Sequence, residues 1–168
     1  MKPFVRALTK FDGILAKGEA WVLIALVAVM AGIVFLQVVY RYLLTQPLHW
    51  SEEMARYLFV WISLLGAAMS VQRRGHFGMD FFCRMLPSKG RRFIACLVYL
   101  LVGIVMLVLL VYGIVLVGKT ADQRSPAMEI SMSWAYACIP VGAALMAIHL
   151  LAVVLKETEK KPVPSENA

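Results

Sequence analysis

Few side chains of this 168-residue chain could do chemistry inside its long apolar stretches. The main polar residues there are Gln37, Ser63, Ser133 and His149, and no Asp, Glu, Lys or Arg lies near the middle of a stretch. A transport or catalytic site within a membrane requires costly polar groups at depth. Gln37 and Ser63 are typical of residues that join neighbouring helices. We therefore predict no catalytic residue and no enzyme.

The histidines do not suggest a cofactor or metal site either. A bis-histidine haem site needs two imidazoles at matching depth on facing helices, whereas His49 and His76 are predicted at edges on opposite sides of the membrane. His149 is then a lone imidazole on an apolar helix. His76 and Asp80 are four residues apart, and two ligands are too few for a metal ion, so a hydrogen-bonded pair or a helix start is favoured. We expect no cofactor.

The unusual charged residues gather at the ends of two apolar stretches. Arg41 closes the first stretch, and the sequence from Trp50 to Glu53 opens the second, with Arg56 one turn later. Glu52 and Glu53 are spaced to pair with Arg56 along a helix. Trp50 suits an interfacial aromatic belt. Because charges near lipid need partners, we expect a short hairpin in which Arg41 pairs with Glu52 or Glu53.

These ends must be positioned by membrane helices. The chain is 61% hydrophobic and 16% charged, with a mean hydropathy of +0.77, whereas a soluble domain is about 45–50% apolar and about 25% charged. Uncharged windows cover residues 20–40, 57–71, 93–118 and 130–155. The second window is short, but a helix capped by Ser51 would reach bilayer thickness. Pro140 is expected to kink the fourth.

We predict an all-α integral membrane protein with one domain over residues 1–168. Its spans are placed at about 20–44, 51–72, 92–118 and 130–155. In residues 1–18, Phe4, Leu8, Phe11 and Leu15 alternate with cations, which predicts an amphipathic segment lying in the interface. A second interfacial segment is predicted in the middle connection, around residues 79–86.

The positive residues indicate the orientation. The formal charge is +7, from 17 Lys and Arg against 10 Asp and Glu. Residues 1–20, 72–92 and the tail 156–168 contain 13 of the positive residues, and the two other connections contain four. Since positive residues remain inside, both termini and the middle connection are predicted to be cytoplasmic. The charge therefore indicates membrane topology, and no nucleic acid partner is expected.

One stretch resembles a known family. The segment from Arg41 to Phe82 reads RYLLTQPLHWSEEMARYLFVWISLLGAAMSVQRRGHFGMDFF. It resembles the small membrane subunit, the Q component, of tripartite ATP-independent periplasmic (TRAP) transporters. The matching features are the Arg-Tyr pair at residue 41, the WSEE opening, Arg56, the small residues from Gly66, and the sequence from Arg73 to Asp80. The motif covers about a quarter of the chain, and the four-span layout agrees in pattern.

The resemblance implies sodium-driven secondary uptake of an organic acid across a bacterial or archaeal inner membrane. A periplasmic binding protein, the P component, would deliver the substrate. A large elevator-type membrane subunit, the M component, would hold the substrate and sodium sites. The small subunit would brace the large one and help to dock the binding protein, without chemistry of its own.

The resemblance also suggests roles for named residues. Arg41, Trp50, Glu52, Glu53 and Arg56 would hold the outer end of the first hairpin. Gly66 would belong to a small-residue packing face, and His76 and Asp80 would fix the turn into the middle connection. A possible contact with the binding protein is the outward connection, through Asp122, Arg124 and Glu129.

Two other classes remain as alternatives. A self-sufficient small transporter working as an oligomer needs a membrane-embedded carboxylate, and every acid of this chain lies outside the four uncharged windows. A membrane anchor of a redox complex would need haem or quinone groups, for which His149 is the only candidate ligand within a window.

Overall fold

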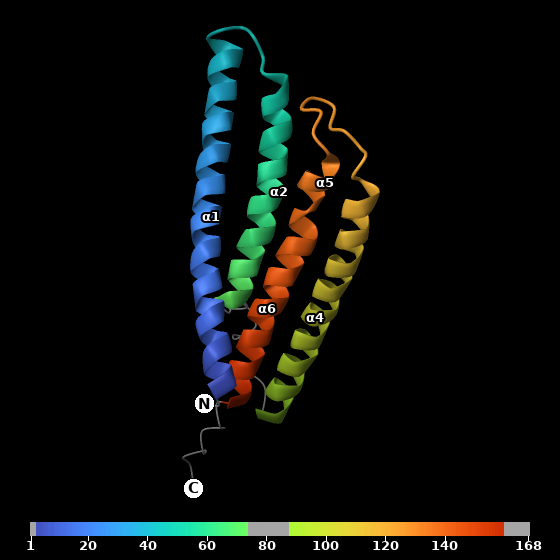
Figure 1. The fold of residues 1–168 in the computed structure, drawn as a ribbon. Coiled ribbons are helices and arrows are strands. Elements are labelled where there is room, and N and C mark those ends of the chain that lie inside the picture. Colours follow the sequence, from blue (N-terminus) through green and yellow to red (C-terminus); the bar gives the residue numbers. More distant parts are fainter. Residues whose placement is uncertain (1–2, 74–87, 160–168) are drawn as a thin grey trace.

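A computed structural model describes residues 3–73 and 88–159, and every regular element in them is a helix (Figure 1). The helices are α1 (Pro3–Tyr42), α2 (His49–Gln72), α4 (Ser88–Lys119), α5 (Met132–Tyr136) and α6 (Cys138–Glu159). Four segments are long and apolar enough to cross a membrane, with α5 and α6 together forming the fourth. The prediction of an all-α membrane protein with four spans is confirmed.

The long helices run up and down side by side (Figure 1). The turn end of the bundle contains the connections 43–48 and 120–131, and the terminal end contains the start of α1 and the end of α6. The predicted segment around residues 79–86 and the residues His76 and Asp80 lie outside the described residues.

Helix α6 lies at the centre of the packing, because it contacts α1, α2 and α4. A small core joins Ala68 of α2, Met106 of α4 and Met146 of α6. The backbones approach closely at two glycines. A Cβ atom on Gly142 would lie 3.0 Å from the Leu64 Cβ, and one on Gly113 would lie 2.9 Å from the Pro140 Cδ.

Helix α1 differs from the prediction of a separate interfacial segment over residues 1–18. From Pro3 to Tyr42 it is one continuous helix of 40 residues. Its length is therefore about 60 Å, roughly twice the hydrocarbon thickness of a bilayer. The reason is visible in its packing: Asp12 and Glu19 are buried against α6, so the first half of α1 extends the bundle instead of leaving it.

The starts of α2 and α6 also differ from expectation. Helix α2 begins at His49, and its N-cap is Leu48, not Ser51. The Ser51 hydroxyl donates back to the Leu48 carbonyl (2.7 Å), which makes Ser51 part of the first turn. The expected kink at Pro140 takes the form of a break at Ala137 between α5 and α6. Pro140 then lies in the first turn of α6, where a missing N–H is tolerated.

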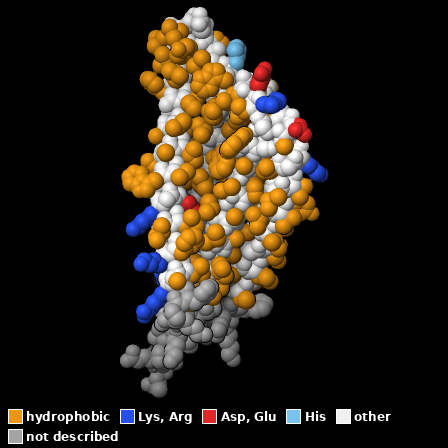
Figure 2. All heavy atoms as spheres, in the orientation of Figure 1, with side chains coloured by type: hydrophobic (Ala, Val, Ile, Leu, Met, Phe, Trp, Pro, Cys, Tyr) orange, Lys and Arg blue, Asp and Glu red, His pale blue; other side chains and the backbone are white. Residues whose placement is uncertain are grey.

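The surface separates apolar from charged side chains (Figure 2). Hydrophobic side chains cover the middle of the visible face, whereas Lys and Arg side chains project along the lower part of α1 and mixed charges gather near the turn end. Two large side chains of α1, Trp21 and Phe35, are 73% and 70% exposed. An apolar exterior of this kind is compatible with lipid or with a second membrane subunit.

Candidate interaction site at the turn end of the bundle

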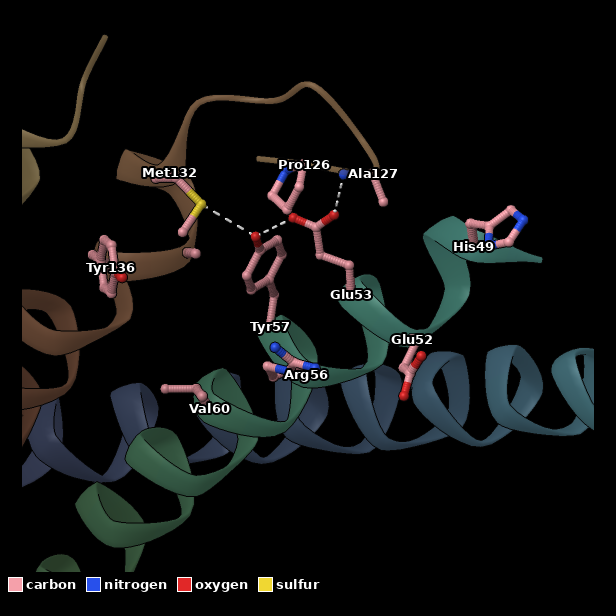
Figure 3. A pocket seen from close by; sticks show the side chains of 11 residues that line it. His49, Glu52, Glu53, Arg56, Tyr57, Val60, Pro126, Ala127, Met132 and Tyr136 are labelled. Carbon is pink, nitrogen blue, oxygen red and sulfur yellow. Dashed lines mark hydrogen bonds between the residues drawn. The ribbon is translucent and has the colours of Figure 1, made fainter. Parts of the chain in front are cut away.

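Glu53 lies at the centre of the polar contacts at the turn end (Figure 3). It stands on the first turns of α2 and is buried, with 8% of its surface exposed. One carboxylate oxygen, Oε2, accepts a hydrogen bond from the Ala127 backbone N–H (2.8 Å), and Oε1 accepts one from the Tyr57 hydroxyl. The Met132 Sδ lies 3.2 Å from the same hydroxyl. Glu53 thereby joins α2 to a connection 74 residues away.

Contacts within the connection 120–131 fix the position of the Ala127 N–H group. An isolated β-bridge pairs Arg124 with Ser131. The Ser125 N–H donates to the Ile130 carbonyl (2.8 Å), and the Met132 N–H donates to the Gln123 carbonyl (2.9 Å). Residues 126–129 therefore form a closed loop over α2, with Ala127 facing Glu53 (Figure 3). A backbone donor held in this way satisfies a buried carboxylate without a second charge.

A cavity of about 460 Å³ lies beside Glu53. Helix α2 contributes one wall, and Pro126, Ala127 and the residues of α5 contribute the other. The lining residues on α2 are His49, Glu52, Glu53, Arg56, Tyr57 and Val60. Its lining combines the exposed charged side chains of Glu52 and Arg56 with apolar side chains such as Val60, so it offers both charge and apolar surface to another molecule.

The chemistry of this site follows from its hydrogen bonds. Both oxygens of Glu53 accept bonds from uncharged donors, so the carboxylate is satisfied within the chain. Such a group fixes the position of a loop and does not need to transfer a proton. In the described part of the chain, no cluster of three or more His, Cys, Asp or Glu side chains is arranged to hold a metal ion.

Comparison with known protein families identifies the family of this chain. Residues 30–160, which include all of α2, α4 and α5, match the model for tripartite ATP-independent periplasmic transporters, DctQ component. The chain belongs to the DctQ family. The resemblance recognised in the segment from Arg41 to Phe82 is thus confirmed, and this DctQ chain is a small permease subunit of a TRAP transporter.

Individual relatives agree with the family match. The chain is 32% identical over 139 residues to the sialic acid TRAP transporter small permease protein SiaQ of Vibrio cholerae, covering 79% of this chain and 77% of SiaQ. It is 32% identical over 135 residues to the sialic acid TRAP transporter permease protein SiaT of Haemophilus influenzae, covering 80% of this chain. That match spans only 22% of SiaT.

A further relative is named for another substrate. The C4-dicarboxylate TRAP transporter small permease protein DctQ of Rhodobacter capsulatus is 32% identical over 111 residues, which cover 62% of this chain and 47% of the relative. The relatives are therefore named for different transported compounds, and SiaQ and the DctQ protein of Rhodobacter capsulatus share the description of a small permease protein.

The structure arranges the predicted hairpin residues differently from the expected ion pairs. Arg41 is exposed, and its Cζ lies 5.9 Å from the centroid of the Tyr42 ring. Within the described residues, no salt bridge joins Arg41 to Glu52 or Glu53. Glu53 has uncharged partners instead. Glu52 and Arg56 are exposed and line the cavity, with Glu52 pointing away from Ala127 (Figure 3). The expected pairing with Glu53 is therefore wrong, because uncharged donors already satisfy this buried acid.

The remaining predicted residues are spread along the bundle. Trp50 lies in the first turn of α2 and is 37% exposed, in keeping with an interfacial position. Gly66 faces α1, but a Cβ atom there would lie 3.9 Å from Leu23, so the closest approaches occur at the two glycines described above. Asp122, Arg124 and Glu129 are exposed on the connection 120–131, and Arg124 donates to the Glu129 carbonyl (3.0 Å).

Sequence reasoning missed the partners of two buried groups. Tyr57 is four residues after Glu53, a spacing from which their contact could have been predicted. The Ala127 N–H left no signal, since a backbone donor is present at every position but proline. His149 was interpreted as a lone imidazole, yet it contacts Asp12 and Glu19 of α1. The sequence signal for this contact was that the two acids are seven residues apart, which places both on one face of a helix.

Proposed function

We propose that the chain is the non-catalytic scaffold subunit of a TRAP transporter that takes up an organic acid with sodium. The observation that carries the proposal is the distribution of charge on a DctQ-family bundle. Of the ionisable groups that make buried contacts, Glu53 lies at the turn end, and Asp12 and Glu19 precede the first apolar window. His149 lies within the fourth window, and the four windows contain no Asp, Glu, Lys or Arg. A subunit built in this way offers packing surface rather than an ion pathway.

The first proposed partner is a large membrane subunit, the M component. Two relatives named as TRAP transporter permeases, SiaT and the isethionate permease DctMQ of Oleidesulfovibrio alaskensis, are matched over only 22% of their length. This supports a small unit that works beside a much larger membrane part. The exposed apolar surface of α1 is the candidate contact, since none of its most apolar window is buried within the chain.

The second proposed partner is the periplasmic substrate-binding protein, the P component. The connection 120–131 presents Asp122, Arg124 and Glu129 to solvent. Glu53 fixes this connection on α2 through Ala127. A charged loop held in place by a buried bond suits a transient, mainly electrostatic docking contact. We place this end in the periplasm and both termini in the cytoplasm of a bacterial or archaeal inner membrane, as the distribution of Lys and Arg favours.

Reconstitution tests the proposal directly. Liposomes would contain the chain alone, the large subunit alone, or both, with the binding protein and labelled organic acid outside and a sodium gradient. We expect sodium-dependent uptake with both subunits present and none with this chain alone. Flux through this chain alone would refute the scaffold role, and undiminished uptake by the large subunit alone would refute the need for a brace.

A further inference from the structure

A second buried polar cluster lies toward the terminal end of the bundle, away from the site described above. Asp12 and Glu19 are seven residues apart on α1 and therefore project from one face of the helix. Between them lies His149 of α6, which is fully buried. Its Nδ1 is 2.6 Å from the Asp12 Oδ1, and its Nε2 is 3.0 Å from both carboxylate oxygens of Glu19.

The hydrogen-bond geometry determines how many protons this cluster holds. An ionised carboxylate only accepts hydrogen bonds, and a neutral imidazole has one N–H donor and one bare nitrogen. With both acids ionised and the ring neutral, a nitrogen lone pair would face a carboxylate oxygen at hydrogen-bond distance. One further proton, on the ring or on one carboxyl group, turns that repulsive contact into a hydrogen bond. All three side chains are buried, so water cannot supply the missing donor at low cost.

We propose that Asp12, Glu19 and His149 form a proton-binding site, and that the bound proton fastens the first half of α1 to α6. With the proton bound, the three groups carry a net charge of −1 and every ring nitrogen contact is a hydrogen bond. Loss of the proton leaves a charge of −2 and one repulsive contact. The fastening therefore weakens when the pH rises.

Other ionisable side chains on the neighbouring helices set the surroundings of this site. Arg73 follows the last residue of α2, five residues beyond the core residue Ala68, and lines a pocket together with Ala20 of α1. Helix α4 carries Tyr99 and Cys96 just before Gly103, which lies against Leu150. Helix α6 itself carries Lys156 two turns beyond His149. Among the described residues, the ring nitrogens of His149 contact the two acids of α1.

The position of the site gives the proton a structural consequence. Glu19 is the last charged residue before the uncharged window of α1, so the site lies where this helix leaves its apolar stretch. The segment before it has exposed cations, Arg6, Lys10 and Lys17, on the surface away from α6. Without the cluster, this polar half of α1 would lose its buried polar contacts with α6. Proton occupancy thus controls whether the first half of α1 remains packed on α6.

Nuclear magnetic resonance of the full chain in lipid nanodiscs, with any subunit that co-purifies, tests the proton count. The chain contains three histidines, and His149→Gln identifies the signal of His149 by its loss. At neutral pH we expect either two protonated ring nitrogens on His149, or one protonated nitrogen and a carboxylic acid band in the infrared spectrum that disappears in Asp12→Asn or Glu19→Gln. A neutral ring without a protonated carboxyl group would overturn the proposal.

Limited proteolysis tests the fastening. Trypsin cleaves after Lys10 and Lys17 only when the helix opens locally, and cleavage after Arg124 in the connection 120–131 serves as an internal reference. We expect His149→Gln to accelerate cleavage at the two lysines by on the order of tenfold relative to Arg124, because a neutral amide leaves one carboxylate without a donor. Raising the pH should accelerate the same cleavages in the unmodified chain.

A triple variant separates the proton from the packing. Asp12→Asn, Glu19→Gln and His149→Gln together keep side chains of similar size and provide donors and acceptors without a titrating group. We expect its cleavage at Lys10 and Lys17 to return toward the unmodified rate and to lose the pH dependence. Equal acceleration in the single and triple variants, or an unchanged pH dependence in the triple variant, would show that the bound proton does not fasten the helices.

Discussion

The two ends of the bundle satisfy buried carboxylates in different ways. At the turn end, Glu53 accepts hydrogen bonds from a phenol and a backbone N–H, and both donors are uncharged. At the terminal end, Asp12 and Glu19 lie on either side of one imidazole, and this arrangement needs an additional proton. Both clusters join segments far apart in the sequence, but one contains a single charge and the other contains three titratable groups.

This difference determines what each end can do. Uncharged donors hold the loop on Glu53 without a second charged group, which suits a surface that must present the same shape to a partner. A cluster with two acids and one histidine changes its charge with each proton, which suits a contact that can open. Substitutions at the two ends should therefore change the free energy of unfolding by different amounts. Removing His149, which contacts two acids, should cost more than removing one of the two uncharged donors of Glu53.

His149→Leu is expected to have the largest effect. It removes the group between Asp12 and Glu19 and leaves two buried carboxylates without their partner. Breaking a buried charged contact in this way costs about 3–5 kcal/mol of the free energy of unfolding. The measurement is unfolding in a detergent titration, followed by circular dichroism. Ala147→Leu on the exposed side of the same helix is the matched control and should change the free energy of unfolding by less than about 0.5 kcal/mol.

Equal effects of the two substitutions would contradict the difference between the two ends of the bundle. If His149→Leu and Ala147→Leu destabilise the chain equally, the cluster at the terminal end carries no more energy than an ordinary apolar position. The two acids would then be solvated, contrary to their burial.

Glu53→Ala is expected to come second. It leaves the Tyr57 hydroxyl and the Ala127 N–H without their acceptor, at a cost of about 1–3 kcal/mol. The connection 120–131 should then loosen, so that sodium-dependent uptake by the assembled transporter falls while the binding protein alone keeps its affinity for substrate. Substrate uptake and calorimetric titration of the isolated binding protein measure the two quantities.

Glu52→Ala provides the control for that experiment. Glu52 is the sequence neighbour of Glu53, has the same charge and is exposed. Its loss should leave stability within about 0.5 kcal/mol of the unmodified chain. A larger effect on stability from Glu52→Ala than from Glu53→Ala would contradict the assignment of Glu53 as the fixed point of the turn end.

The sequence allowed the helices and the family to be predicted more readily than these two clusters. Long runs without charge dictate membrane helices, and the WSEE motif with its flanking arginines carried the resemblance. The contact between Glu53 and Ala127 could not be predicted, because it depends on a backbone N–H and on the fold of a loop 74 residues away.

The terminal cluster was hidden by its surroundings in the sequence. Residues 1–18 contain a regular pattern of cations and large apolar residues, which favours an interfacial helix. Asp12 interrupts that pattern, and Glu19 follows it at the distance of one heptad, but their partner lies 130 residues or more along the chain. Two acids on one face of a cationic segment, together with one histidine in an apolar helix, form a combination that predicts a contact only once helix neighbours are known.

Tyr57→Phe is expected to have the smallest effect and to distinguish the two ends most sharply. It removes one neutral donor from Glu53 but retains the ring and the bond from Ala127. The expected loss is about 0.5–1.5 kcal/mol in the free energy of unfolding, measured as for the other variants. A loss as large as that of His149→Leu would mean that the two ends do not differ in kind, because a single neutral donor would then hold the turn end as strongly as the shared imidazole holds the terminal end.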